Sequence, residues 1–278
     1  MSAISTKGLA LPGFLCVSLC AAVAEVSLAV TVPVTFDLWP SHGKANVLEI
    51  TAAAEIDYFA GVLDTGDSSS ADMSGHVTAD LEIHLDPATP HIVDILAITL
   101  TGGNIRFEDV AMELDFSPFG SIQADLISVA ATPGTPVPPV GVHGDTFDAG
   151  EHALTANMGS VNLSGTGLIG QLYMDPISTD LSSEPVDLGP AGTGVLEAAL
   201  LRVDGDQATY EVILTLPVDW DVVTYDRNGA RLSVEGVGTV GAAGRFVQMI
   251  PEPATMALLA FGALVLPRRR RTNAALRQ

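Results

Sequence analysis

Beyond its first 24 residues, this chain has no cysteine. The only two, Cys16 and Cys20, lie in an apolar N-terminal segment that we expect to be removed. The remaining chain therefore offers no disulfide, no thiolate nucleophile and no cysteine-ligated metal. A body of more than 200 residues can bury a sufficient core without disulfide bonds, so the lack of cysteine does not argue against export.

Basic side chains are also scarce. From residue 30 to residue 249 the chain carries 31 acidic and 6 basic residues, a net charge near −25. Such a field repels nucleic acid and anionic lipid, so we expect neither as a partner of this region. We interpret the charge as a solubilising, self-repelling surface, with a dedicated cation site as the alternative.

Aromatic residues make up only 5% of the chain, and Trp39 and Trp220 are its two tryptophans. Glycosidases need a pair of carboxylates and usually add aromatic sugar platforms, which this composition hardly provides. The sequence contains no G-x-S-x-G, no H-E-x-x-H and no phosphate-binding glycine loop. The six histidines are scattered, and we expect them on the surface. We predict that the protein is not an enzyme, with a secreted hydrolase as the minority alternative.

The N-terminus has the features of a secretory signal. Lys7 precedes an uncharged apolar stretch over residues 9–24, which ends in the small-residue cleavage pattern Ala22-Val23-Ala24. A second cleavage candidate is Ser27-Leu28-Ala29. The sequence therefore predicts a signal peptide over residues 1–24 or 1–29, and a chain exported from the cytoplasm.

The C-terminus combines three features in a fixed order: a short polar motif, an uncharged apolar run over residues 254–266, and a cluster of arginines. As a helix, the 13 apolar residues would be about 20 Å long, short against a hydrocarbon core of about 30 Å. The arginines cannot enter that core and would hold the end in the cytoplasm. We predict a C-terminal transmembrane helix with a cytoplasmic stop-transfer cluster made of Arg268, Arg269, Arg270 and Arg271.

This tail resembles the PEP-CTERM sorting signal, also catalogued as an ice-binding protein C-terminal domain. The resemblance covers residues 250–272 and is carried by Pro251, Glu252 and Pro253, the apolar run and the arginines. It implies recognition by an exosortase, a membrane enzyme that processes its substrates near the PEP motif, and association with exopolysaccharide. It implies nothing about ice binding by the rest of the chain.

The body shows the period-two alternation of half-buried β-strands. Apolar and polar residues alternate over 47–57, 74–87, 110–116 and 210–216. Sustained helical periodicity is not found between residues 30 and 249. The fold class predicted is all-β, an antiparallel β-sandwich or a partly open barrel.

Turn signals divide the C-terminal half into five predicted strands, near residues 195–203, 208–216, 219–226, 230–240 and 244–250. Asn228-Gly229 is the strongest hairpin signal, because both residues tolerate the positive φ that a tight turn needs. Asp204-Gly205-Asp206 and Gly102-Gly103-Asn104 are expected to be turns as well.

The proline-rich stretch 132–140 is the stiffest part of the body. It suggests a linker between two β-rich lobes, 30–131 and 141–249. A single β-domain with a long loop explains the same sequence equally well, so both alternatives stay open.

Two acidic clusters are candidate Ca²⁺ sites, because this cation prefers several carboxylate and carbonyl oxygens on a flexible loop. Neither has the spacing of an EF-hand loop. The second cluster could gain Asp219 and Asp221 from the next turn. The candidate ligands are Asp64, Asp67 and Asp72 in the first cluster, and Asp204 and Asp206 in the second.

Together these features predict an exported, non-catalytic protein of the cell surface or extracellular matrix, sorted through its tail by an exosortase. Its membrane helix would anchor it until processing. A Ca²⁺- or carbohydrate-binding β-module is the alternative, and Ca²⁺ is the one cofactor that the sequence suggests.

Overall fold

The computed structural model describes residues 28–38, 46–85, 92–133, 139–152, 154–189 and 192–250. These residues form a body of antiparallel strands with one short α-helix and one 3-10 turn. In chain order the elements are β1 (Leu28–Leu38), β2 (Val47–Tyr58), β3 (Gly61–Leu85), β4 (Ile92–Phe107), β5 (Val110–Asp115), β6 (Ser121–Pro133), β7 (Val140–His143), β8 (Thr146–Asp148), η1 (Ala149–Glu151), β9 (Leu154–Gly165), α1 (Gly167–Leu172), β10 (Ile177–Asp180), β11 (Val186–Asp187), β12 (Thr193–Asp204), β13 (Gln207–Arg227) and β14 (Ala230–Met249).

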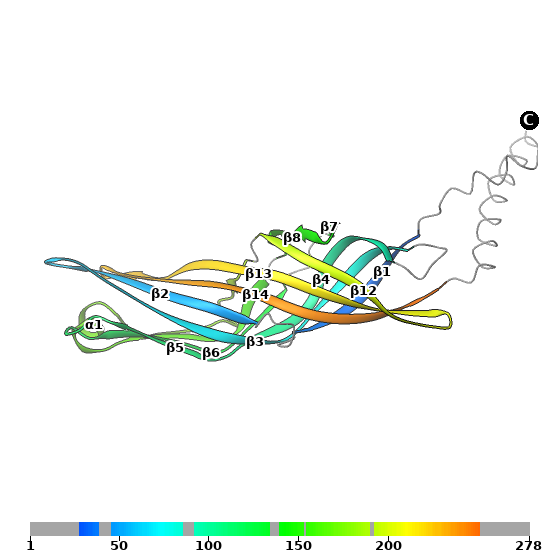
Figure 1. The fold of residues 1–278 in the computed structure, drawn as a ribbon. Helices are drawn as coiled ribbons and strands as arrows, with labels where there is room; N and C mark the ends of the chain where they lie inside the picture. Colours follow the sequence, from blue (N-terminus) through cyan, green and yellow to red (C-terminus); the bar gives the residue numbers. More distant parts are fainter. Residues whose placement is uncertain are drawn as a thin grey trace, which may run out of the picture.

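The body is elongated, with α1 at one end and the last residues of β14 at the other (Figure 1). The long strands β2, β3, β13 and β14 run along its length. Alternate residues of these strands point inward and form one hydrophobic core, in which Phe36, Val212 and Leu214 are fully buried. The all-β antiparallel class predicted from the alternation is therefore confirmed.

The strands belong to one hydrogen-bonded sheet, which curls back on itself. Its path runs β1-β3-β2-β14-β13-β12-β8-β7-β4-β6-β9-β10, and β3 also pairs with β4. The first half of β3 pairs with β2, whereas its second half pairs with both β1 and β4. Because of this curl, the layer formed by β2, β13 and β14 faces the layer formed by β6 and β9.

The hairpin predicted at Asn228-Gly229 is confirmed, since both residues have positive φ, 55° and 76°, between β13 and β14. Asp204-Gly205-Asp206 joins β12 to β13 as expected. The strand predicted at 47–57 corresponds to β2, and the one at 110–116 corresponds to β5.

Three predicted breaks were wrong, because the structure has longer strands there. β13 continues through Pro217, and β14 continues through residues 241–243. Pro217 is tolerated because β12 pairs with β13 only as far as Thr215, so one edge of β13 has no described partner beyond it. Gly102-Gly103 lies within β4 and does not turn the chain. An added Cβ on Gly103 would lie 2.6 Å from the carbonyl oxygen of His76, so this glycine permits a close approach of β3 and β4.

The two predicted lobes are not separate units in the described residues. β2 pairs with β14, β6 pairs with β9, and β4 pairs with β7, so strands from both sides of the proline-rich stretch share one sheet. The start of that stretch, Thr132 and Pro133, belongs to β6. One core unites the two halves because neither half alone completes the curl of the sheet.

The predicted signal peptide and the predicted C-terminal helix lie outside the described residues, except that residues 28 and 29 belong to β1. Within the described ranges, no helix is both long enough and apolar enough to cross a membrane.

Candidate functional site

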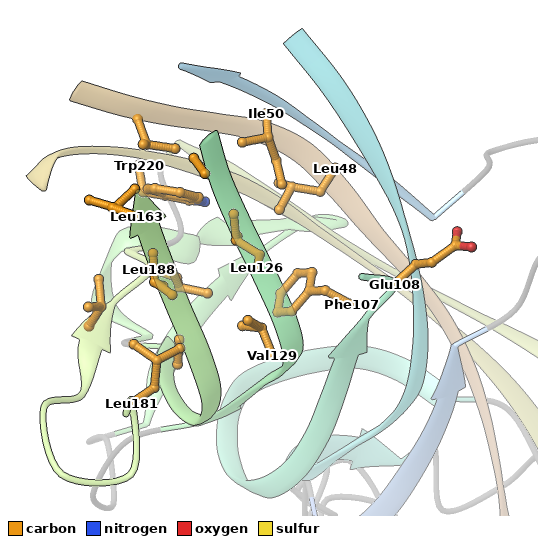
Figure 2. Close-up of a pocket in the computed structure, with 15 residues that line it drawn as sticks. Leu48, Ile50, Phe107, Glu108, Leu126, Val129, Leu163, Leu181, Leu188 and Trp220 are labelled. Atoms are coloured by element: carbon orange, nitrogen blue, oxygen red, sulfur yellow. The ribbon is translucent and has the colours of Figure 1, made fainter. Parts of the chain in front are cut away.

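The most distinctive cavity is an apolar slot between the two facing layers (Figure 2). Its volume is about 70 Å³. Side chains of β2, β13 and β14 line one side, and side chains of β6 and β9 line the other; among them are Ile50, Trp220, Val234, Leu126 and Leu163. A cavity of this size, if it stayed empty, would cost about 1.7 kcal/mol of stability at ~24 cal/mol per Å³. The slot is therefore an incompletely filled part of the core.

Trp220 supplies the polar atom that is buried in this wall. Its Nε1 has no hydrogen-bond acceptor among the described residues. The ring lies over Gly236, its partner across the β13–β14 ladder, where an added Cβ would overlap the indole. A buried indole N–H usually finds a partner, and leaving one unpaired costs about 1–3 kcal/mol. The slot thus combines apolar walls with one unused donor.

A second cavity of about 440 Å³, which we call the hollow, adjoins the slot. Phe107, Glu108 and Val129 line both cavities. In Figure 2, Glu108 points away from the apolar side chains, whereas Trp220 lies among them. The hollow adds polar groups, including the exposed Arg106 and the backbone around Ser128. The hollow therefore brings some polar groups to one end of the otherwise apolar slot.

A β-bulge shapes the hollow. The register of β6 against β9 shifts between Ile127 and Ala130, and Ser128 has a φ of 53°. The Asp109 carboxylate accepts a hydrogen bond of 2.6 Å from the Ser128 backbone N–H and holds this conformation. Gly159 of β9 faces the bulge, where an added Cβ would lie 2.6 Å from two carbonyl oxygens. Bulges of this kind often re-aim side chains beside functional sites.

The first predicted Ca²⁺ cluster is spread along a strand. Asp64, Asp67 and Asp72 all belong to β3, which is an extended strand and not the flexible loop that Ca²⁺ prefers. Asp64 and Asp72 are eight residues apart, about 26 Å at ~3.3 Å per residue, and Asp67 faces the opposite side. Asp67 instead accepts hydrogen bonds from the backbone N–H groups of Ser68 and Glu113, which ties β3 to β5. The structure does not bring these three carboxylates together.

The second predicted cluster lies at the β12–β13 turn. Asp204 forms an exposed ion pair of 3.4 Å with Arg202, and the Asp206 carbonyl accepts a hydrogen bond from Ile250 N–H at 2.6 Å. Asp219 and Asp221 do not join them, because they lie in the middle of β13 and not in a turn. Asp219 is 13 residues from Asp206, about 43 Å along the strand at ~3.3 Å per residue.

In the part of the chain that the structure describes, no three His, Asp or Glu side chains are grouped closely enough to hold a metal ion. Ca²⁺ binding therefore stays a prediction without a described site. The sorting motif, Pro251 to Pro253, and the arginine cluster lie outside the described residues.

His152 contradicts the expectation of surface histidines, because its side chain is fully buried. Its ring meets Phe147 edge-on at a centroid distance of 5.6 Å, and neither ring nitrogen has a partner among the described residues. Burial lowers the pKa of His152, and the nearby Asp148 carboxylate opposes this effect in part. The neutral imidazole is therefore the form that the fold favours.

We expect acid to destabilise the fold through His152. In the unfolded chain its pKa is about 6.5, above the lowered folded value. The unfolded state then binds more protons between the two values, so this contribution is complete above about pH 6.5 and is lost as the pH falls toward the folded pKa. Urea midpoints measured from pH 7.5 to pH 5 should fall more steeply for the natural protein than for His152→Leu. His143→Leu, at an exposed histidine, is the control and should keep the natural slope; equal slopes in all three proteins would contradict the prediction.

Sequence reasoning missed the slot and the hollow. The walls of the slot come from strands that are far apart in the chain. Whether these strands meet depends on which layers of the folded sheet face each other. The sequence carries no local signal for either cavity, because a bulge between Val223 and Tyr225 is what places Trp220 opposite Gly236.

Comparison with known proteins gives little guidance. No protein family matches the chain, and no curated protein is similar to it in sequence. Among solved structures, the outer membrane protease OmpT from Escherichia coli aligns with 81% of this chain and 99% of its own, at 9% identity and a TM-score of 0.21. A TM-score that low supports no argument about fold or activity.

Proposed function

We propose that this chain is an exported, non-catalytic protein of the cell surface or extracellular matrix, sorted by its C-terminal tail through an exosortase and associated with exopolysaccharide. The order of the tail supports this proposal: Pro251-Glu252-Pro253, then an uncharged run, then four arginines. The run is apolar on all sides, which is unusual for a helix on the surface of a soluble domain.

The folded body is compatible with such a tail. Ile250, the residue directly before the motif, is held by its hydrogen bond to Asp206. The last described residue of the β-rich body therefore directly precedes the sorting motif. Ile250 follows β14 at one end of the elongated body, opposite α1, so the body would extend away from its point of attachment (Figure 1).

The charge of the body fits an exposed position outside the cell. With 31 acidic and 6 basic residues between positions 30 and 249, the body repels an anionic membrane surface. The arginines beyond residue 267 carry the opposite charge and prefer the cytoplasmic face. This asymmetry orients the chain with its body outside.

The test is to express the full chain in a host that has an exosortase and in the same host with the exosortase gene deleted. Cell fractions and intact masses are then compared. We expect loss of the first 24 to 29 residues in both hosts, but a new C-terminus near Pro251 only where the exosortase is present. An intact chain, soluble in the periplasm or cytoplasm, would overturn the proposal. A chain that keeps its C-terminus in the inner membrane of both hosts would leave a membrane-anchored envelope protein and refute exosortase sorting.

A further inference from the structure

We propose that the slot and the hollow together bind a short acyl ester, with the acyl chain in the slot and the polar group that carries it in the hollow. This inference concerns the body alone and does not depend on how the tail is processed.

The walls of the slot determine which part of the ligand enters it. Leu126 and Leu163 from one layer face Ile50 and Val234 from the other, and polar atoms contribute almost nothing to the surface of the slot. Only an aliphatic or aromatic group gains free energy by leaving water for such walls. An empty, dry apolar cavity is a known binding site for small apolar molecules.

The volume of the slot limits the length of that group. At about 70 Å³ it is roughly half of a 150 Å³ cavity that holds benzene. An unbranched chain of about three or four carbons fits this space, whereas a benzene ring or a long fatty chain does not. The slot therefore selects short chains.

Trp220 determines which functional group of the ligand lies next to its hydrocarbon chain. Its Nε1–H is buried at the slot and has no acceptor among the described residues. A carbonyl oxygen at the start of the chain would accept this hydrogen bond, which an alkyl ether would do more weakly and a hydrocarbon not at all. Among short-chain molecules, an acyl group meets both requirements of the slot.

The hollow accommodates the carrier of the acyl group. Its volume of about 440 Å³ is within the range of about 300–1,000 Å³ that ligand sites occupy. Arg106 can donate hydrogen bonds to hydroxyl groups, and Glu108 can accept them. Asp109 keeps the bulge at Ser128 in place, so the hollow is formed before a ligand arrives. A polyhydroxyl carrier, such as glycerol or a sugar, suits these groups.

Calorimetric titration with the glycerol esters of acetate, butyrate and octanoate tests the proposal. Each buried methylene should tighten binding about fourfold, so glycerol monobutyrate should bind about fifteenfold more tightly than the monoacetate. The octanoate should bind no more tightly than the butyrate, because the slot is then full. Glycerol alone should not bind. Affinity that keeps rising with chain length, or no saturable binding of the butyrate, would overturn the proposal.

Two variants locate the ligand. Ala124→Val places two extra carbons in the slot from β6 and should abolish binding of glycerol monobutyrate while raising the urea midpoint, so unfolding cannot explain the loss. Ala52→Val, at a fully buried alanine of β2 outside the slot, is the matched control. Ala52→Val should lower the urea midpoint by overpacking the core. Its affinity for glycerol monobutyrate should stay within about twofold of that of the natural protein, a difference smaller than the loss of one hydrogen bond. Unchanged binding by Ala124→Val would place the ligand elsewhere and refute the site.

Trp220→Phe tests the hydrogen bond separately. The substitution keeps an aromatic six-membered ring at the wall but removes the pyrrole half of the indole with its N–H, so affinity for glycerol monobutyrate should fall about three- to tenfold. Affinity for the butyl ether of glycerol, which lacks the carbonyl, should change little. Equal losses for ester and ether would show that Trp220 acts only as an apolar wall, and would overturn the assignment of an acyl group.

Discussion

Replacing Gly75 with alanine should destabilise the body by about 3–5 kcal/mol, one of the largest effects expected for a single methyl group. Gly75 lies within β3 and has a φ of 119°, a backbone conformation that residues other than glycine rarely adopt. An added Cβ would also overlap the carbonyl of Asn104 on β4. Backbone strain alone accounts for about 1–3 kcal/mol, and the overlap adds to it because backbone atoms cannot move aside. Urea unfolding of the purified protein measures the loss.

Gly189→Ala is the matched control for this substitution. Gly189 has no positive φ, and an added Cβ there meets no atom within 4 Å. We expect a change between zero and a gain of about 1 kcal/mol, because alanine restricts the unfolded chain. If Gly75→Ala were as stable as Gly189→Ala, the close approach of β3 and β4 would be refuted.

Replacing Pro251, Glu252 and Pro253 together by alanine should reduce C-terminal processing at least tenfold in an exosortase-positive host, a threshold of about 1.4 kcal/mol in recognition free energy. The proposed sorting enzyme would lose the polar motif that precedes the apolar run, while the apolar run proposed to span the membrane and the arginines after it remain. The variant should therefore accumulate uncleaved in the inner membrane. Intact-mass measurement of the membrane fraction detects it.

Asn273→Ala serves as the control, because this residue lies beyond the segment that resembles the sorting signal. It should be processed like the natural chain. Normal processing of the triple variant would refute recognition through the motif, even if the protein still reaches the cell surface.

The strand content could be predicted from the sequence because alternation is a local property. β2 and β5 were predicted nearly to their ends, and the hairpin at Asn228-Gly229 follows from the φ preferences of two residues. The lengths of β13 and β14 could not be predicted, since a proline and a glycine-rich stretch break most strands. Whether such residues end a strand depends on which edge of that strand is hydrogen-bonded to a neighbour. That pairing is decided by segments far away in the chain.

The candidate site was beyond sequence reasoning for a more specific reason. Counting back from the Asn228-Gly229 turn pairs Trp220 with Val237, yet a bulge between Val223 and Tyr225 shifts the register, so the ring lies over Gly236. A shift of one residue exchanges the two faces of a strand. The slot exists because of this shift and because β6 and β9 fold over the same face. Neither feature has a local signature.

The ladder between β2 and β14 also limits when the sheet can be completed as the chain is synthesised. The two strands are separated by more than 170 residues, and Ala54 faces Leu232 across them. A chain that is made or exported N-terminus first cannot complete this ladder until Gly238 has appeared, about 180 residues after β2. Non-local pairing of this kind is slow and leaves strand edges exposed in the meantime. On the export route proposed above, the β2–β14 ladder would therefore form only after residues 230–238 had crossed the membrane.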